Sequence, residues 1–312
     1  MICVLAGGVG AARLLVGLVR VVPPREIVAV VNTADDVVLH GLHISPDIDT
    51  VTYTLAGTHN TDTGWGLAGE TWAAMGALES LGGPVWFSLG DRDLGTHMYR
   101  TGRLAEGVGL AEVTSGIASS FGLGVCLLPM TEDRVATMVT LAEGDRAGVE
   151  VGFQEWFVGL GHVVPVAGVR FDGVEVARPG PGVLEAIAEA EVVVVAPSNP
   201  IVSIGPLLAI PGLTDALKAR REDTVAVSPI VAGAALKGPA ARLMEDLGYE
   251  ASVVGVASLY REVAATLVVD TADASLAGAV EATGMACVVT DTVMADPTVA
   301  AALAKVTLEA AW

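Results

Sequence analysis

Four aspartates within fifteen positions are the residues whose type and spacing most clearly indicate chemistry. They are Asp35, Asp36, Asp47 and Asp49. Neither lysine nor arginine occurs between Glu26 and Asp91, so the local sequence offers these carboxylates no cationic partner. Like charges that converge in a fold repel one another, and a divalent cation is the simplest relief. Oxygen ligands suit Mg²⁺ or Ca²⁺, so the segment predicts a metal site.

The aspartates also have a simpler interpretation. Ser45-Pro46-Asp47 is typical of a helix start, where Asp47 would cap the first turn. Asp49 would then lie inside that turn and face the same region. Both roles are compatible, because helix N-termini and metals often share a phosphate site.

A glycine-rich turn precedes the aspartates. Gly7-Gly8-Val9-Gly10 follows the apolar run Ile2 to Ala6 and precedes a segment with helical spacing. Glycines at such a place let the backbone approach a phosphate or a sugar closely. Arg13 stands where the dinucleotide fingerprint has its third glycine, and no Gly-Lys-Ser/Thr follows. Gly7, Gly8 and Gly10 are therefore either a phosphate site or simply a tight turn.

A charged turn lies further along the chain, at Gly90-Asp91-Arg92-Asp93, followed by Thr96 and His97. Arg92 is the first basic residue after a gap of 66 residues. A salt bridge within an exposed turn explains such alternating charges. The sharper interpretation is that Arg92 contacts a phosphate or an anionic ring, with His97 nearby.

Two polar loops follow very hydrophobic segments in the second half of the chain. They are Ala196-Pro197-Ser198-Asn199-Pro200 and Val227-Ser228-Pro229-Ile230. The carboxyl ends of parallel strands form the ligand edge of a sheet, and Asn199 could read a base edge there through its amide. A plain turn between strand and helix is the equally weighted alternative.

The elements that position these motifs alternate between strand and helix. The first are a strand at Ile2 to Ala6, a helix at Ala11 to Val21 and a strand at Ile27 to Val31, which is the opening of a parallel α/β sheet. Further strands are predicted at Val192 to Ala196, Thr224 to Ser228, Val253 to Val256, Thr266 to Val269 and Ala286 to Val289. Helices are predicted at Gly182 to Ala190, Gly205 to Arg220, Ala240 to Leu247, Ser258 to Ala265, Ser275 to Thr283 and Pro297 to Ala311.

The pattern changes in the middle of the chain. Helices are predicted at Asp49 to Ala56, Glu70 to Leu81, Thr96 to Gly102 and Leu110 to Phe121. Strands, expected to be antiparallel, are predicted at Gly124 to Leu128, Ala136 to Leu141, Val149 to Phe157 and Val169 to Phe171. We therefore divide the chain into a Rossmann-like core of residues 1–56 and 181–312 and an inserted α+β layer of residues 57–180.

Composition excludes several classes of function. The 312 residues are 52% hydrophobic, which is enough for a large core. The longest uncharged window, Val192 to Thr214, contains four prolines that would break a spanning helix. A net charge of −19 disfavours nucleic acids and anionic membranes as partners. The start of the chain has no basic region typical of a signal peptide, so we predict a cytoplasmic protein. Three separated cysteines, Cys3, Cys126 and Cys287, are expected to be buried thiols.

Taken in order, six segments resemble one family, the 2-phospho-L-lactate transferases of deazaflavin coenzyme F-420 biosynthesis. The segments are Ala6 to Gly10, Asn32 to Asp36, Ser45 to Thr50, Leu89 to Asp93, Pro197 to Pro200 and Ser228 to Ile230. The resemblance extends from Ile2 to the stretch that ends at Met294. Phe153 to Phe157 and Thr71-Trp72 look closer to the actinobacterial members, which use an enolpyruvyl donor, whereas archaeal members use a lactyl donor.

The resemblance implies a reaction and a fold. The donor is a guanosine diphosphate diester that carries 2-phospholactate or phosphoenolpyruvate. The acceptor is the deazaflavin ribityl compound Fo, whose primary hydroxyl attacks the phosphorus distal to guanosine and releases GMP. The family is Mg²⁺-dependent and homodimeric. Its fold is a three-layer α/β sandwich with a Rossmann-like, mostly parallel sheet, and the inserted layer would cover the acceptor site.

The resemblance also implies roles for single residues. Mg²⁺ would lie among the four aspartates, with Asp49 touching both the metal and the acceptor hydroxyl and Arg92 binding the acceptor or the transferred phosphoryl group. Gly7, Gly8 and Gly10 would lie against the donor phosphates with Arg13 as an additional cation, and Ser198 and Asn199 near guanosine. The remaining ligand-binding residues implied by the motifs are Asn32, Asp91, Thr96 and His97.

Two other classes of function compete with this one. A non-catalytic regulator that binds nucleotide sugars would resemble the related morphogenesis proteins, which share the opening glycines. Those proteins lack the full acceptor-side set, whereas Gly90 to Asp93 and Thr96-His97 are intact here. An NAD(P)-linked oxidoreductase is suggested by the sheet alone, and the missing third glycine and the aspartates speak against it.

Overall fold

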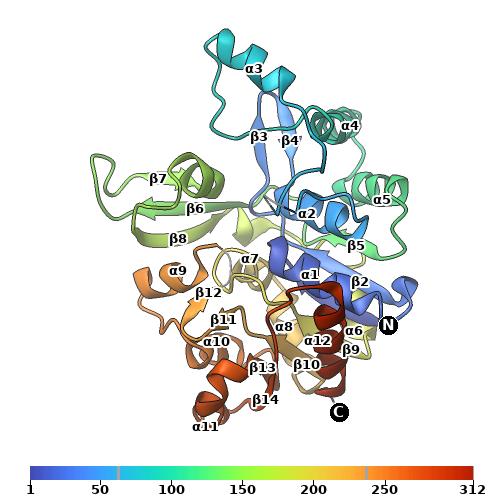
Figure 1. Cartoon of the computed structure of the whole chain (residues 1–312), viewed down its shortest axis with the longest axis vertical. Helices are drawn as coiled ribbons and strands as arrows, with labels where there is room; N and C mark the ends of the chain where they lie inside the picture. The colour runs from blue at the N-terminus through green and yellow to red at the C-terminus, as the bar shows by residue number, and fades with distance from the viewer. Residues whose placement is uncertain (62–63, 236–237, 312) are drawn as a thin grey trace.

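A seven-stranded sheet forms the centre of the computed structural model, which describes residues 1–61, 64–235 and 238–311 (Figure 1). The strand order is β14-β13-β10-β9-β1-β2-β5, and each neighbouring pair is parallel. The strands are β1 Ile2–Ala6, β2 Ile27–Val31, β5 Cys126–Pro129, β9 Val192–Val195, β10 Thr224–Val227, β13 Thr266–Asp270 and β14 Ala286–Thr290. The order of strands reverses between β1 and β9, which is where open α/β sheets bind their ligands.

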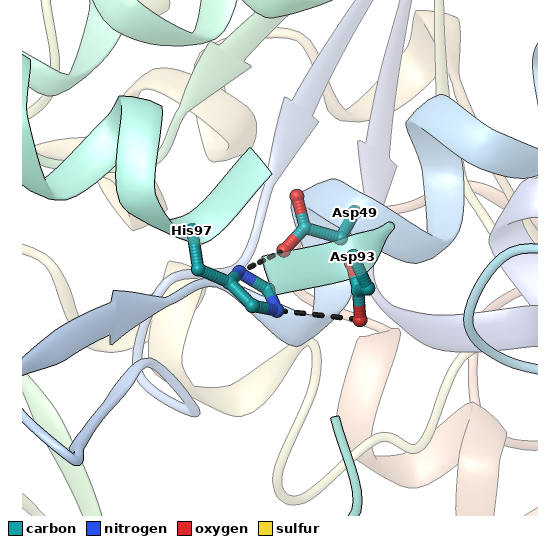
Figure 2. Close-up of side chains that lie close together, drawn as sticks. All are labelled: Asp49, Asp93 and His97. Atoms are coloured by element: carbon teal, nitrogen blue, oxygen red, sulfur yellow. Dashed lines mark ion pairs between the residues drawn. The ribbon is translucent and has the colours of Figure 1, made fainter. Parts of the chain in front are cut away.

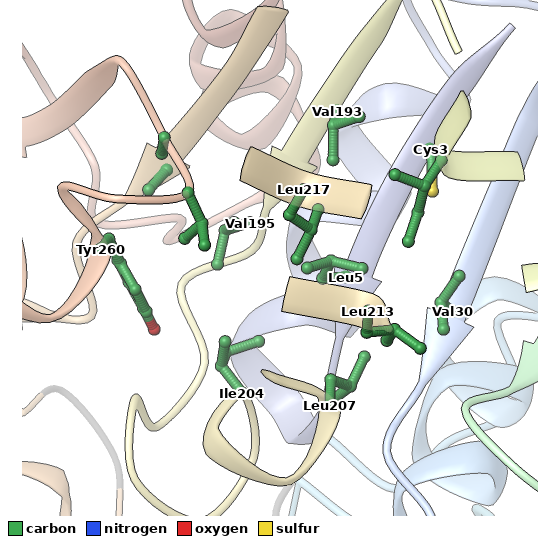
Figure 3. Packing of buried hydrophobic residues seen from close by; sticks show 14 of the residues in the cluster. Cys3, Leu5, Val30, Val193, Val195, Ile204, Leu207, Leu213, Leu217 and Tyr260 are labelled. Carbon is green, nitrogen blue, oxygen red and sulfur yellow. The ribbon is translucent and has the colours of Figure 1, made fainter. Parts of the chain in front are cut away.

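Both faces of this sheet are buried. Along β1, Ile2 and Val4 pack into one apolar layer, while Cys3 and Leu5 pack into the other. Figure 3 shows the second layer, where Leu5 lies near side chains of the covering helices such as Leu213. Parallel strands that are covered on both faces are expected to read as continuous apolar runs, which explains why these segments were recognisable from the sequence.

Helices cover the two faces. The first layer combines α1 Gly8–Leu18, α2 Pro46–Leu55, α5 Leu110–Ser120 and α12 Pro297–Glu309. The second layer combines α6 Val183–Glu189, α7 Gly205–Ala209, α8 Leu213–Ala219, α9 Ala240–Asp246, α10 Val253–Tyr260 and α11 Ala277–Glu281. Together with the sheet they form the predicted three-layer α/β sandwich with a Rossmann-like core.

The remaining elements stand beyond the sheet. A hairpin of β3 Val37–Leu39 and β4 Leu42–Ile44 rises towards α3 Ala73–Ser80 and α4 Asp93–Ala105, at the opposite end of the molecule from α12 (Figure 1). Three antiparallel strands, β6 Ala136–Leu141, β7 Glu150–Gly152 and β8 Val166–Asp172, form a separate small sheet. A short hairpin of β11 Ile230–Val231 and β12 Ala234–Ala235 completes the strands.

Three predicted elements were wrong. The segment Gly124 to Leu128 was expected to be antiparallel, yet β5 pairs in parallel with β2 and extends the main sheet. Val253 to Val256 was expected to be a strand, yet it begins helix α10, because Ser252 accepts the N–H groups of Val254 and Gly255 and caps that helix. Val149 to Phe157 contains only the short β7 before a π-helical turn at Glu155–Gly159.

Two further differences are smaller. The predicted helix Gly205 to Arg220 is divided into α7 and α8 at Ile210-Pro211-Gly212, because proline cannot continue the hydrogen-bond ladder of a helix. Cys126 was expected to be buried, but it is exposed on the edge strand β5. Across the described ranges, no helix combines the length and the apolar character that a bilayer span requires.

Candidate functional site

Two turns meet where the strand order reverses, at the carboxyl ends of β1 and β9. The hydroxyl of Ser198 donates to the carbonyl oxygen of Gly7 at 2.8 Å and accepts the N–H of the same residue at 3.3 Å. A Cβ atom on Gly10 would lie 2.1 Å from the carbonyl oxygen of Pro197, and one on Gly7 would lie 2.9 Å from Oδ2 of Asp47. Both glycines are therefore required by close packing, which brings the turn directly against an aspartate.

Asp47 belongs to an acidic pocket at the end of β2. Nδ2 of Asn32 donates to Oδ2 of Asp47 at 3.0 Å. Oδ2 of Asp36 accepts the hydroxyl of Ser45 at 2.6 Å and lies 2.8 Å from Nε2 of His43. We define the acidic pocket as Asp35, Asp36 and Asp47. Its three aspartates come from the loop after β2 and from the first turn of α2, as the sequence predicted.

The electrostatics of the acidic pocket are unfavourable for the free carboxylates. Burial, together with the negative charge of Asp36, raises the pKa of Asp47 to about 7 from an ordinary value of 3.8. Burial and the charge of Asp47 also raise the pKa of Asp35. Burial raises the pKa of Asp36 against the opposing effect of His43. The pocket therefore holds acidic groups that the protein alone does not neutralise.

Several oxygens of this pocket are left without a hydrogen-bond partner. Oδ1 of Asp35 and Oδ1 of Asp36 are buried and find no partner in the described part of the chain. The hydroxyls of Thr33 and Thr137 are in the same condition within those residues. Buried oxygens without a donor are costly, and oxygen donors of this kind are the ligands that Mg²⁺ prefers. In the part of the chain that the structure describes, however, the three acidic or imidazole side chains whose ligand atoms lie within 4.8 Å of one another are Asp49, Asp93 and His97. The close grouping of possible metal ligands is therefore centred on Asp49 and not on the acidic pocket.

Asp49 lies in a second cluster, which helix α4 supplies. Nη1 of Arg100 lies 3.1 Å from Oδ2 of Asp49, and Nη2 of Arg100 binds its other oxygen. Nδ1 of His97 lies 3.7 Å from Oδ2 of Asp49, and Nε2 of His97 lies 3.3 Å from Oδ2 of Asp93 (Figure 2). The hydroxyl of Tyr53 donates to Oδ1 of Asp93 at 2.6 Å. We call Asp49, Tyr53, Asp93, His97 and Arg100 the ion-pair cluster.

The spacing on α4 explains how this cluster forms. Asp93, His97 and Arg100 are four and three residues apart, so one face of the helix carries all three. That face is buried, and Arg100 is 0% exposed. Although burial opposes ionisation, hydrogen bonding and attraction from His97 hold the pKa of Asp93 below its ordinary value. The ion pair with Asp49 raises the pKa of Arg100 despite its burial.

The two clusters are in electrostatic contact through Arg100. The positive charge of Arg100 lowers the pKa of Asp36 and pairs with the carboxylate of Asp49. Nη1 of Arg100 also lies 3.4 Å from the carbonyl oxygen of His43, and the imidazole of His43 contacts Asp36. The four predicted aspartates are therefore divided between two neighbouring groups. The local sequence offers Asp49 no cation, as stated above, but the fold brings Arg100 to it from 51 positions along the chain.

The charged turn before α4 has mainly a structural role. Oδ1 and Oδ2 of Asp91 accept the N–H groups of Ala74 and Ala73 at 3.0 Å each, so this carboxylate caps α3. These bonds and one from Thr71 lower the pKa of Asp91. Arg92 is exposed, and its Nη1 donates to the carbonyl oxygen of Ala68 at 2.7 Å. Thr96 is half-buried on the first turn of α4.

The two remaining predicted residues lie at the glycine turn and in the loop after β9. Arg13 is exposed on α1, with Nη1 3.5 Å from the carbonyl oxygen of Met294. Oδ1 of Asn199 accepts the N–H groups of Ile201 and Val202 at 2.9 and 3.3 Å, which fits the plain-turn interpretation. Its Nδ2, however, is buried and has no partner in the ranges that the structure covers, so that donor is available to a ligand.

The sequence reasoning missed Arg100, Tyr53, His43 and the role of Asp93. For Arg100 and Asp93 the sequence held one indication, because Asp93, His97 and Arg100 are spaced so that they lie on one helical face. Tyr53 and His43 carried no comparable signal. The arrangement as a whole combines a close-packed glycine turn, a group of buried aspartates and a carboxylate held by an ion pair, which suits chemistry at phosphorus.

Known proteins resemble this chain over almost its whole length. A family model described as 2-phospho-L-lactate transferase CofD matches residues 2–307. A phosphoenolpyruvate transferase of Kitasatospora aureofaciens is 43% identical over 312 residues, covering 98% of this chain and 96% of the relative. A phosphoenolpyruvate transferase of Thermobifida fusca is 44% identical over 270 residues, covering 83% of this chain and 82% of the relative.

A solved structure shares the fold at much lower identity. It is a crystal structure of a UPF0052 family member from Bacillus halodurans, with a TM-score of 0.62 and 17% identity. The match covers 98% of each chain. At this level of identity the likeness concerns the arrangement of helices and strands alone.

Proposed function

The chain belongs to the 2-phospho-L-lactate transferase CofD family, and from that premise we propose that it transfers a phosphoenolpyruvyl or phospholactyl group to Fo in coenzyme F-420 biosynthesis. The primary hydroxyl oxygen of Fo forms a bond to the phosphorus distal to guanosine. The bond from that phosphorus to the bridging oxygen breaks, GMP leaves with the bonding electron pair, and the hydroxyl proton is released. The product is a phosphodiester.

The main support for this proposal is the position of the acidic pocket. It lies directly against the glycine turn, since a Cβ atom on Gly7 would come within 2.9 Å of Asp47. Two of its carboxylates keep a buried oxygen that no described residue satisfies. Mg²⁺ would be held by Asp35, Asp36, Asp47 and Asp49, and when bound it neutralises negative charge on the donor phosphates.

The chain's own residues would position the two substrates. The turn of Gly7, Gly8 and Gly10 would hold the donor phosphates, with Arg13 beside them and Asn199 Nδ2 available to guanosine. Asp49 would orient the acceptor hydroxyl, because the ion pair with Arg100 fixes both of its oxygens.

The acceptor-side residues follow from the same premise. Arg92 would bind the acceptor or the transferred phosphoryl group, since its guanidinium is exposed at the start of α4. His97 would hold Asp49 in position without contacting the substrate, because it is 1% exposed and lies between Asp49 and Asp93. Helix α4, from the middle of the chain, would cover the acceptor.

The relatives favour the enolpyruvyl donor. Those with 43% and 44% identity carry the name phosphoenolpyruvate transferase. The segment Phe153 to Phe157, which pointed to actinobacterial members, lies beside the site, since Nε2 of Gln154 is 3.5 Å from the carbonyl oxygen of Asp35. One double bond separates the two donors, so the choice needs a direct measurement.

The experiment is an incubation of the protein with Fo, Mg²⁺ and each guanylylated donor in separate reactions, followed by mass analysis. We expect GMP and the dehydro form of the coenzyme core from the enolpyruvyl donor. Product from the lactyl donor alone would reassign the donor, and product from neither would refute the proposal. Tight binding of a nucleotide sugar without turnover would instead support the regulator.

Two further expectations belong to this proposal. A cytoplasmic location is the expectation from the apolar, uncharged start of the chain, and a homodimer is what the resemblance to the family implies. Light scattering coupled to size-exclusion chromatography measures the second directly, and a monomeric mass at working concentrations would contradict it.

A further inference from the structure

The edge strand β14 leaves apolar residues uncovered at one end of the main sheet. In the described part of the chain it has a neighbour on one side only, which is β13 (Figure 1). Its sequence, Ala-Cys-Val-Val-Thr, contains no charge, yet none of its five residues is buried, whereas β13 is buried throughout. Val289 is 39% exposed. Exposed apolar surface of this kind often belongs to an interaction site.

The outer side of β14 also carries backbone groups that are available for pairing. The N–H of Ala286 donates to the carbonyl oxygen of Ala265 at 2.7 Å, so the backbone of Ala286 faces β13, as does that of every second residue after it. Cys287 and Val289 therefore direct their N–H and C=O groups away from the sheet. Those groups have no hydrogen-bond partner within the ranges that the structure describes.

The β14 edge lacks the features that usually prevent two edge strands from pairing. Such features are a lysine, a proline, a bulge or a covering element. Neither a charged residue nor a proline occurs from Ala282 to Thr290, and the register with β13 is regular over the whole strand. The other edge strand, β5, differs, because it ends in Pro129 and α5 packs against it. A further strand can therefore add to the sheet at β14.

Charged groups at the two ends of β14 indicate which strand would add there. At the start, Nη2 of Arg221 donates to the carbonyl oxygen of Gly284 at 2.7 Å, while its Nη1 pairs with Glu222 at the surface. At the far end, Asp291 follows the strand and is exposed. A second copy of β14 in antiparallel orientation would bring the Asp291 of each copy towards the Arg221 of the other. A parallel copy would instead place Asp291 beside Asp291, which is unfavourable.

We propose that the β14 edge is a homodimer interface, in which two copies pair antiparallel about a two-fold axis at Val288 and join their main sheets into one. In this register Cys287 of each copy exchanges both backbone hydrogen bonds with Val289 of the other copy. Asp291 then lies opposite Met285, next to the residue that binds Arg221. The inference goes beyond the proposed function, because three strands separate β14 from β1 and its glycine turn.

A charge placed on the β14 edge tests the interface. In Val289→Lys, two lysines would lie diagonally across the two-fold axis, about 7–8 Å apart on one face. We expect a dimer for the parent and a dissociation constant raised about tenfold or more for the variant, as measured by light scattering coupled to size-exclusion chromatography over a dilution series. Val176→Lys is the matched control, because Val176 is 82% exposed and lies outside the main sheet. Thermal unfolding verifies that both variants fold.

Disulfide cross-linking tests the register. In a Cys126→Ser/Cys287→Ser background, Val288→Cys would face its own copy in a non-hydrogen-bonded pair, with Cα atoms about 4.5 Å apart, which is within the range of a disulfide. Thr290→Cys is the matched control on the same strand, because Thr290 would lie opposite Ala286 and about 13 Å from the other Thr290. After oxidation we expect a covalent dimer for Val288→Cys alone.

Three outcomes would overturn the inference. They are a monomeric parent throughout the dilution series, an unchanged dimer in Val289→Lys, and cross-linking of Thr290→Cys in preference to Val288→Cys. A monomeric parent would assign the edge to a different partner, and an unchanged dimer would place the interface on another face. Turnover of Fo by the same proteins is measured separately, so each of these outcomes leaves the proposed reaction intact, and a dimer without turnover would refute that reaction alone.

Discussion

Asp49 and Arg100 form a buried, bidentate ion pair that links the predicted metal-binding segment to helix α4. Both guanidinium Nη atoms of Arg100 bind the carboxylate, and the side chain of Arg100 is 0% exposed. The pair fixes the orientation of Asp49, because a planar guanidinium and a planar carboxylate match in only a narrow range of geometries. Several properties of the protein should depend on it.

Replacing Arg100 should destabilise the protein strongly. In Arg100→Met the carboxylate of Asp49 stays buried without its partner, which typically costs ~3–5 kcal/mol. Arg103→Met is the matched control on the same helix, because Arg103 pairs with Glu106 and Glu112 at the surface, where such pairs contribute about 0–1 kcal/mol. Urea unfolding of both variants measures the difference. Equal free energies of unfolding for the two variants would show that the buried ion pair stabilises the protein no more than the exposed pairs do.

Neutralising Asp49 should reduce both turnover and stability, because Asp49→Asn leaves the guanidinium of Arg100 buried without its anionic partner. Asp49→Asn keeps the size of the side chain but removes the charge that we propose orients the acceptor hydroxyl, so kcat at saturating Mg²⁺ should fall by roughly 10²-fold or more. Asp215→Asn on α8 controls for loss of an exposed negative charge. Steady-state kinetics with Fo and the preferred donor provides the measurement. Full turnover by Asp49→Asn would remove Asp49 from the mechanism.

The acidic pocket should make the metal-free protein sensitive to pH. Burial raises the pKa of Asp47 from 3.8 to about 7, so the folded state holds its proton more tightly than the unfolded chain does. The stability from this group is complete below the unfolded pKa and is lost as pH rises through the folded pKa. Without divalent cation, the free energy of unfolding should therefore decrease between pH 3.8 and about 7.

Asp47→Asn and added Mg²⁺ test the origin of that slope. Asp47→Asn should flatten the decrease in part, since Asp35 contributes in the same direction. Mg²⁺ should restore stability most at the upper end of the window, where the carboxylates are ionised and free to bind it. Thermal unfolding in a pH series reads both effects. Parallel profiles for the variant and the parent would assign the slope to other groups.

The glycine turn should not tolerate a side chain at position 10. In Gly10→Ala the new Cβ atom would lie 2.1 Å from the backbone oxygen of Pro197, so one of the two turns must shift. Such overpacking costs roughly 1–3 kcal/mol, and activity should fall because this is the turn that we propose binds the donor phosphates. Gly102→Ala in α4 meets nothing within 4 Å, and it should instead stabilise the protein by about 0.5–1 kcal/mol. Two variants of equal stability would contradict this account.

The sequence by itself determined the parallel sheet and the position of its ligand edge. The strands Ile2–Ala6 and Val192–Val195 are buried on both faces and therefore read as continuous apolar runs. The turns and polar residues that follow such strands must meet at one edge of the sheet. For this reason the order of apolar runs and polar turns is sufficient to predict that the glycine turn, Ser198 and the acidic pocket lie together.

Only the tertiary structure decided which charges are paired and which are free. Asp49 is neutralised by Arg100 from α4, whereas Asp35 keeps an oxygen without a partner among the described residues. Asp91 caps a helix although its motif suggested a ligand contact. Local spacing cannot reveal such pairings, because each depends on where a distant segment packs.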